Sequence, residues 1–324
     1  MRTRRLHRFN FSFARPELKP LFSAIFHHLS ISNLIDFILS VYFYNCSLSP
    51  CRIELDDQTT VHYWTPRTRH FNKPNLVVIH GCGGNPKWQF VRQVGRLSEA
   101  FNLFLPDLLF FGKSHTERSE RSDYFQAKCV GDGLRRLGVG RFSVYGISYG
   151  GFVAARVAEM WRDEVEKVVI VSCGIVFSEE QREKRLREIG RSMVELFVPE
   201  KASDLRPLIS LCFSKLHPLM WVVPDFVLRD FFMALGTEYK KERRELLEHL
   251  LARKAGSDLP LLTQETLLIW GEEDAVFPLF MAYQLQRYLG PKASLEVLKG
   301  TGHAANLESP REVNELIESF VLGH

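Results

Sequence analysis

The sequence predicts an α/β protein in which helices cover both faces of a mostly parallel sheet, with a helical cap inserted into the chain. Two observations carry this prediction. After Pro50, short apolar or β-branched runs of strand length alternate with amphipathic helical stretches, which is typical of parallel sheets in α/β folds. Between Cys173 and Thr266 this alternation stops, and because a structureless loop of that length is uncommon in a compact domain, we expect independent helices there.

The composition is that of a folded globular protein, with 324 residues, 45% hydrophobic and 25% charged. The net charge of +4 is concentrated in residues 1–20, which contain six basic residues and one acidic residue, so the rest of the chain is nearly neutral. A nearly neutral body lacks the basic stripe that nucleic-acid binding needs, and we expect no nucleic-acid partner. The six cysteines are scattered, which predicts free thiols in a reducing compartment; Cys46 and Cys51 would pair only in an oxidising lumen.

The first expected element is an amphipathic helix over residues 21–44, within an N-terminal segment of residues 1–49. Asp36 lies near its middle and argues against a membrane-spanning helix. Two interpretations stay open: the helix packs on the body as an arm, or it lies on a membrane surface with the preceding basic residues facing anionic lipid. The Arg-rich, acid-poor start also resembles an organelle transit peptide. The expected location is cytoplasmic or peripheral on an intracellular membrane, with an organelle as the alternative.

Eight strands are expected after this segment. They cover residues 52–55, 60–64, 76–80, 102–105, 142–146, 167–172, 266–270 and 294–298. The first two form a hairpin. Helices are expected over residues 87–100, 124–137, 150–161, 279–289 and 310–321. Residues 50–175 and 264–324 form the core domain, and residues 176–263 form the cap, with helices beginning near Ser178, Pro224 and Glu238.

Gly146-x-Ser148-x-Gly150 lies where an expected strand ends and an expected helix begins. A serine in such a sharp turn adopts a strained conformation, and larger neighbours would collide with the turn. Because a hydroxyl is a poor nucleophile at neutral pH, it needs a base and an acid that orients the base. The sequence therefore predicts Ser148 as a nucleophile.

The candidate base is His303, which follows the last expected strand, and the candidate acid is Asp274, which follows the seventh. Glu272 or Glu273 is the alternative acid. These residues occupy turns at the ends of parallel strands, the edge on which open sheets gather their sites.

A tetrahedral oxyanion needs two donors, for which we expect the backbone N–H groups of Tyr149, directly after the serine, and of Cys82. Cys82 lies in the glycine-rich loop His80-Gly81-Cys82-Gly83-Gly84. His80 is expected to support this loop rather than to catalyse. The candidate pocket residues are Gly81, Gly83, Phe110, Trp221 and Phe277. No metal or cofactor is implied.

The order H-G-x-G, G-x-S-x-G, G-x-x-D and G-H resembles the α/β-hydrolase superfamily from about residue 52 to the end. The stretches 73–81, 223–228 and 268–278 resemble a group of plant capped hydrolases of unassigned substrate. That group is similar in layout to monoacylglycerol lipases, carboxylesterases and carbon–carbon bond hydrolases of ring-cleavage products. The resemblance implies an eight-stranded α/β-hydrolase fold with an inserted helical cap. Epoxide hydrolases and haloalkane dehalogenases share the fold but use an aspartate nucleophile, so Ser148 argues against both.

The sequence departs from the family pattern in two places. Cys82 stands where an aromatic residue is common, and in residues 107–114 only Asp107, Gly112 and Ser114 match, whereas the intervening residues are more apolar. Both departures favour an apolar substrate.

We therefore expect a serine hydrolase that cleaves a small to medium apolar ester through an acyl-enzyme intermediate. The alternatives are a slow-turnover ligand receptor on the same fold, a carbon–carbon bond hydrolase, or a scaffold that retains the residues without activity. Neither the exact substrate nor the oligomeric state follows from the sequence.

Overall fold

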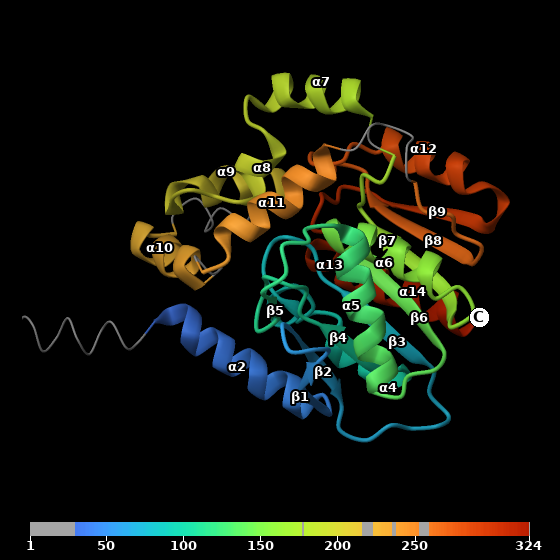
Figure 1. The fold of residues 1–324 in the computed structure, drawn as a ribbon. Coiled ribbons are helices and arrows are strands. Elements are labelled where there is room, and N and C mark those ends of the chain that lie inside the picture. Colours follow the sequence, from blue (N-terminus) through green and yellow to red (C-terminus); the bar gives the residue numbers. More distant parts are fainter. Residues whose placement is uncertain (1–29, 177, 216–222, 235–237, 253–258, 324) are drawn as a thin grey trace, which may run out of the picture.

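A computed structural model describes residues 30–176, 178–215, 223–234, 238–252 and 259–323. These residues contain a nine-stranded sheet with helices on both faces (Figure 1). In chain order the strands are β1 (Leu48–Glu54), β2 (Thr59–Pro66), β3 (Asn75–Ile79), β4 (Asn102–Pro106), β5 (His115–Thr116), β6 (Phe142–Ile147), β7 (Val165–Val171), β8 (Glu265–Gly271) and β9 (Ala293–Leu298). Across the sheet the order is β1-β2-β4-β3-β6-β7-β8-β9, and β5 pairs with β2.

The sheet is mostly parallel, as the sequence predicts. Strands β4, β3, β6, β7, β8 and β9 pair in parallel, whereas β2 pairs antiparallel with β1, β4 and β5. The eight expected strands all correspond to observed strands. The ninth, β5, was missed because its two residues are too few to show a periodic pattern.

The described helices are α2 (Ile31–Asn45), α3 (Pro86–Gln89), α4 (Val94–Ala100), α5 (Asp123–Arg136), α6 (Tyr149–Met160), α7 (Glu179–Ile189), α8 (Met193–Phe197), α9 (Leu205–Cys212), α10 (Asp225–Ala234), α11 (Lys240–Leu251), α12 (Phe280–Leu289), α13 (Ala305–Glu308) and α14 (Pro310–Leu322), with 3-10 helices η1 (Ala202–Asp204) and η3 (Gly290–Lys292).

Successive residues of a strand point to opposite faces of the sheet. Val77 and Ile170 therefore share one apolar cluster with α5 and α6, while Leu76 and Val169 share another with α4 and α14.

The expected helix over residues 87–100 is instead two helices, α3 and α4. The Asn306 side chain donates to the carbonyl of Gln89 over 2.6 Å, and the Asn314 side chain donates to the carbonyl of Arg92 over 3.0 Å. These side chains, distant in the sequence, bind backbone groups that a continuous helix would use. The other expected core helices correspond to α5, α6, α12 and α14.

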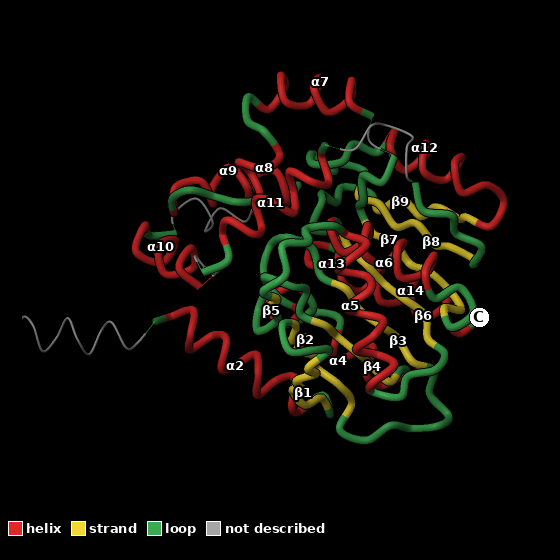
Figure 2. Tube along the Cα trace, in the orientation of Figure 1, coloured by secondary structure: helices red, strands yellow, loops and turns green. Residues whose placement is uncertain are grey.

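Helices α7 to α11 lie between β7 and β8 in the chain, where the helical cap is expected. Figure 2 shows helices and loops, without a strand, in the described part of this insertion. Arg121, from the loop before α5, pairs with Glu245 of α11 over 2.9 Å, so the insertion contacts the body. We refer to these helices and the chain between them as the helical insertion; its role as a cap remains a prediction.

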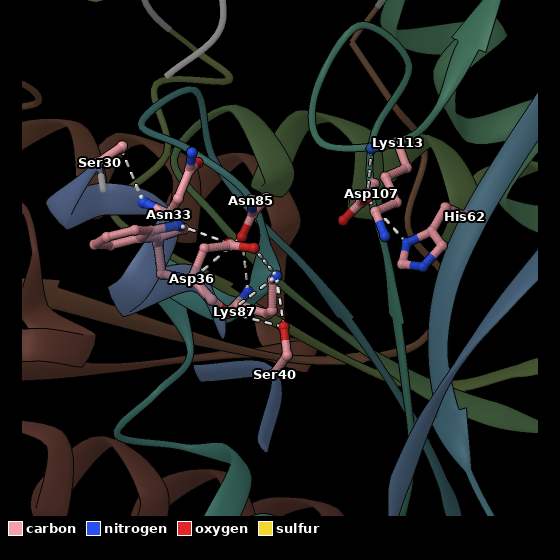
Figure 3. Close-up of polar contacts among 10 residues, drawn as sticks. Ser30, Asn33, Asp36, Ser40, His62, Asn85, Lys87, Asp107 and Lys113 are labelled. Carbon is pink, nitrogen blue, oxygen red and sulfur yellow. Dashed lines mark hydrogen bonds and ion pairs between the residues drawn. The ribbon is translucent and has the colours of Figure 1, made fainter. Parts of the chain in front are cut away.

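Helix α2 packs on the body, in agreement with the interpretation of an arm for residues 31–45. Its buried Phe43 contacts Trp64 of β2 edge to face, with ring centroids 5.2 Å apart. Asp36 forms a 2.5 Å ion pair with Lys87 of α3, which also donates to Ser40 over 2.9 Å (Figure 3). Residues 21–29 of the expected helix lie outside the described residues. Among the helices that the structure describes, none has the length and apolar character needed to cross a membrane.

Candidate active site

Ser148 occupies the turn between β6 and α6, with φ 54° and ψ −122°. This is a strained conformation for a residue with a side chain. A Cβ atom at Gly146 would lie 2.2 Å from the Gly150 oxygen, and one at Gly150 would lie 2.3 Å from the Ile79 oxygen. Neither position has room for a side chain, which explains the two glycines of the motif.

The structure brings Ser148, His303 and Asp274 together in one chain of hydrogen bonds. His303 Nε2 lies 3.0 Å from Ser148 Oγ, and His303 Nδ1 lies 3.0 Å from Asp274 Oδ2. The other carboxylate oxygen, Oδ1, accepts the backbone N–H groups of Val276 and Phe277, each over 2.8 Å. All three side chains belong to buried residues. The carboxylate can thus hold the imidazole with Nδ1 protonated and Nε2 free to accept the serine proton.

The alternative acids do not occupy this position. Glu272 is exposed and its carboxylate accepts the backbone N–H of Gly300 over 3.2 Å. Glu273 is also exposed, and its backbone N–H donates to the Thr301 carbonyl. Within the described residues, Asp274 is the carboxylate that contacts His303.

The loop after β3 lies against the serine, because a Cβ atom on Gly81 would be 3.0 Å from the Cβ of Ser148. Gln89 of α3 binds Gly81 twice, accepting its N–H over 2.8 Å and donating to its carbonyl over 3.1 Å. His80 also reaches this carbonyl from Nδ1 over 2.8 Å, and its Nε2 accepts the Leu108 N–H over 2.9 Å. Burial lowers the pKa of His80 and so favours the neutral imidazole, and the two contacts correspond to the tautomer with its hydrogen on Nδ1. His80 therefore supports the loop, and Gln89, which the sequence analysis did not identify, clamps it.

The two residues expected to supply backbone donors each adjoin a residue of the site, because Tyr149 follows Ser148 and Cys82 follows Gly81, which lies against the serine. Tyr149 is the first residue of α6, and Cys82 follows the clamped Gly81. Burial raises the pKa of the Cys82 thiol to about 12, so this thiol stays protonated, and it packs against the apolar core. All six cysteines are free, and no group of three or more His, Cys, Asp or Glu in the described chain is placed to hold a metal ion.

The turn over residues 107–114 is held by the residues that match the family pattern. Asp107 accepts His62 Nδ1 over 2.9 Å and the Lys113 N–H over 2.8 Å (Figure 3). Ser114 Oγ accepts the backbone N–H of His62 over 2.8 Å, and Gly112 has a φ of 56° that favours glycine. These polar residues fix the turn, so its apolar residues can face other elements.

Two aromatic residues of this turn contact the helical insertion. The ring of Phe110 lies 5.8 Å from that of Tyr239, and the guanidinium of Arg243 lies 5.7 Å from the ring of Phe111. The ring of Phe111 also lies 5.3 Å from that of His80 and 6.4 Å from that of Tyr149. Phe111 thus lies beside His80 and Tyr149. The assignment of Phe110 to a substrate pocket remains a prediction.

Two further aromatic rings flank the imidazole of His303. The ring of Phe277 lies 5.5 Å away, and that of Phe197 in α8 lies 6.4 Å away. Phe277 thus lies beside the histidine, and its assignment to a substrate pocket remains a prediction, whereas Phe197 has no sequence signal beyond an apolar side chain in a short helix. Gly83 lies beside Gln89, and Trp221 lies outside the described residues.

Comparisons with known proteins show the family and the fold of this chain. The model of the family described as alpha/beta hydrolase fold matches residues 74–310. The human monoacylglycerol lipase ABHD6 is 25% identical over 268 residues, 79% of this chain and 77% of its own. A 2-hydroxymuconate semialdehyde hydrolase of Pseudomonas putida is 26% identical over 256 residues, 76% of this chain and 86% of its own.

Among solved structures, a membrane phospholipase A described as a bacterial virulence factor superimposes with a TM-score of 0.77 and 22% identity, covering 94% of this chain and 96% of its own. This similarity concerns the fold. The relatives in sequence support hydrolase activity on it, while the plant origin suggested by the sequence remains a prediction. The family model matches residues 74–310, which make up most of the chain and include Ser148, Asp274 and His303. The chain therefore belongs to the α/β-hydrolase fold family.

Proposed function

We propose that this protein is a serine hydrolase that cleaves a small to medium apolar ester, with Ser148 as nucleophile, His303 as base and Asp274 as the acid that orients the base. The observation that carries this proposal is the pair of 3.0 Å contacts that link Asp274 to His303 and His303 to Ser148. Serine, histidine and aspartate in this geometry act together in acyl transfer on unrelated folds.

The reaction begins when Ser148 Oγ attacks the carbonyl carbon of the ester while His303 Nε2 takes the hydroxyl proton. The tetrahedral intermediate collapses, the ester C–O bond breaks, and His303 returns the proton to the departing alcohol. A water molecule then gives a proton to His303 and attacks the acyl-enzyme. Release of the acid restores Ser148 with its proton.

The proposed donors for the oxyanion are the backbone N–H groups of Cys82 and Tyr149. In a trans peptide the N–H points away from the preceding carbonyl. The carbonyl of Gly81 is bound by Gln89 and His80, so the orientation of the next N–H, that of Cys82, is fixed. Donors that are held before the reaction stabilise developing charge without having to reorganise.

An apolar substrate is supported by the rings of Phe197 and Phe277 beside His303 and by the ring of Phe111 beside Tyr149. The relative named monoacylglycerol lipase favours an ester. The relative named 2-hydroxymuconate semialdehyde hydrolase favours a second candidate, cleavage of a carbon–carbon bond beside a ketone. The same serine, histidine and aspartate serve both candidates.

The test is turnover of a panel of p-nitrophenyl esters with acyl chains of increasing length, alongside a ring-cleavage product of the meta type. Wild type should hydrolyse the short and medium esters, and Ser148→Ala should lose at least about a thousandfold in rate. Ser98→Ala, on α4, is the matched control and should retain full activity. Equal turnover by Ser148→Ala would refute the proposal, and exclusive turnover of the ring-cleavage product would favour the second candidate. Tight ligand binding without turnover would favour a receptor.

We also propose that α2 places the enzyme on an anionic membrane surface. Its outer face exposes Leu34, Phe37 and Ile38, which are 56%, 66% and 54% exposed. The acidic residue of this helix, Asp36, is paired inward with Lys87 (Figure 3). The face is therefore apolar, and residues 1–20 before it carry six basic residues against one acidic residue. An apolar helix face that basic residues precede in the sequence suits the interface of anionic lipid.

Flotation of the full chain with phosphatidylserine-containing vesicles tests this membrane proposal. Wild type should float with anionic vesicles, less so at high salt, and the triple change Leu34→Ser, Phe37→Ser and Ile38→Ser should reduce flotation at least about tenfold. Phe280→Ser with Tyr283→Ser, which replaces exposed aromatic residues of α12, should leave it unchanged. Equal flotation of the triple variant, or a wild-type dimer that the triple change dissociates, would overturn the proposal.

A further inference from the structure

Glu308, at the end of α13, binds two segments of the chain through its two carboxylate oxygens. Oε2 accepts the backbone N–H of Gly302 over 2.6 Å. Oε1 accepts the backbone N–H groups of Ser214 and Lys215 over 2.9 and 3.0 Å, and lies 3.1 Å from the Ser214 hydroxyl. Gly302 directly precedes His303, whereas Ser214 and Lys215 belong to the helical insertion.

A second bond between the same segments lies on the other side of the histidine. The backbone N–H of Ala304 donates to the Cys212 carbonyl over 2.8 Å. The peptide N–H groups before and after His303 are therefore held by Glu308 and by the insertion itself. Ser214 Oγ also lies 3.0 Å from the Gly300 carbonyl, so the contact extends along the whole loop.

The backbones of the two segments approach each other closely at Gly302. A Cβ atom at this position would lie 2.7 Å from the Ser214 nitrogen, 2.8 Å from Glu308 Oε2 and 3.0 Å from the Cys212 oxygen. Any side chain would push the insertion away from the loop or displace the carboxylate. This gives a physical reason for the glycine directly before His303.

From these contacts we infer that Glu308 is a positioning residue that ties segment 212–215 of the helical insertion to the loop carrying His303, and so holds the imidazole against Ser148. This inference rests on the proposed function, since it assigns Glu308 a role in that reaction. Charged acceptors form stronger and shorter hydrogen bonds than neutral ones. A glutamine amide of the same size has one acceptor oxygen and one NH₂ group, and the NH₂ group would face a backbone N–H on one of the two sides.

Glu308→Gln tests the inference, with Glu312→Gln on an exposed position of α14 as the matched control. We expect Glu308→Gln to lower kcat about tenfold or more, with KM within about twofold of wild type, because the imidazole is misplaced while the pocket is retained. Glu312→Gln should match wild type in both constants. Ser214→Ala removes the hydroxyl alone and should lower kcat by about two- to threefold.

A second readout does not depend on turnover. The proton between His303 Nδ1 and Asp274 gives a downfield proton NMR signal, which should weaken or shift in Glu308→Gln and stay in place in Glu312→Gln. Wild-type kcat in Glu308→Gln, together with an unchanged signal, would overturn the inference, as would a loss confined to KM. If Glu308→Gln does not fold, wild-type kcat and signal in Ser214→Ala overturn it. If wild type itself hydrolyses no ester, the proposed function fails, and the NMR comparison still decides whether Glu308 positions His303.

Discussion

Replacing Asp274 with asparagine should move the ring hydrogen of His303 from Nδ1 to Nε2. In the structure Asp274 Oδ1 accepts two backbone N–H groups, those of Val276 and Phe277, while Oδ2 faces His303 Nδ1. An asparagine amide has one oxygen and one NH₂ group. Turning its NH₂ toward the two N–H groups would leave two buried donors unsatisfied, at a cost of roughly 1–3 kcal/mol each. The amide oxygen should therefore stay on the backbone, and the NH₂ group should face the histidine.

An NH₂ group beside Nδ1 favours the imidazole tautomer that carries its hydrogen on Nε2, which cannot take a proton from Ser148. We expect kcat for a p-nitrophenyl ester to fall by about 10⁴, equivalent to about 5.5 kcal/mol of barrier. The rate should recover partly at high pH, where hydroxide can remove the serine proton. Glu273→Gln is the control and should stay within about twofold of wild type. A fall in kcat smaller than about tenfold in Asp274→Asn would refute the reasoning, as would a fall in kcat larger than about tenfold in Glu273→Gln.

Three further outcomes are expected. Gln89→Ala removes the acceptor of the Gly81 N–H and one of the two donors to its carbonyl, leaving His80 as the other, and should lower kcat about tenfold with little change in KM; an unchanged kcat would show that this contact has no part in the mechanism. Gly150→Ala places a Cβ atom 2.3 Å from a backbone oxygen and should destabilise the fold by about 3 kcal/mol or more in urea denaturation; wild-type stability would contradict the tight turn. Because burial lowers the pKa of His80, the unfolded chain binds more protons, and stability should fall as the pH drops below about 6.5. Urea denaturation from pH 8 to 5 should show a shallower dependence in His80→Gln, and an identical slope would count against a buried neutral histidine.

The sequence could predict those parts of the fold that depend on local patterns. The strands of the parallel sheet are apolar runs because both of their faces are buried. Ser148, Asp274 and His303 each lie in a turn after such a run, and since the strands are parallel, the three turns meet at one edge. The order of the strands in the sheet was therefore not needed to predict that these three turns lie close together.

Other features depend on partners that are distant in the chain, and no local pattern reveals them. The helix expected over residues 87–100 divides because Asn306 and Asn314 bind its carbonyls. Gln89 looked like an ordinary helix residue, and its double contact with Gly81 follows only from how α3 packs beside the loop. Glu308 likewise reads as a polar residue near a helix end until segment 212–215 is brought against it.

The amino-terminal helix is an intermediate case. Its helical period is visible in the sequence, but the period alone could not show which face meets the body. The structure places Phe43 against Trp64 and Asp36 against Lys87, which leaves Phe37 on the outside. Residues 31–45 therefore pack on the body as an arm, and contact of its outer face with lipid is our proposal.

The proposed relay from Asp274 through His303 to Ser148 is tested most directly by covalent labelling of the full chain with a fluorophosphonate probe, followed by mass spectrometric mapping. Wild type should carry the adduct on Ser148, and His303→Ala should label at least about a hundredfold more slowly, because the serine has lost its base. An unmodified Ser148 in wild type, or equally fast labelling without His303, would contradict the relay.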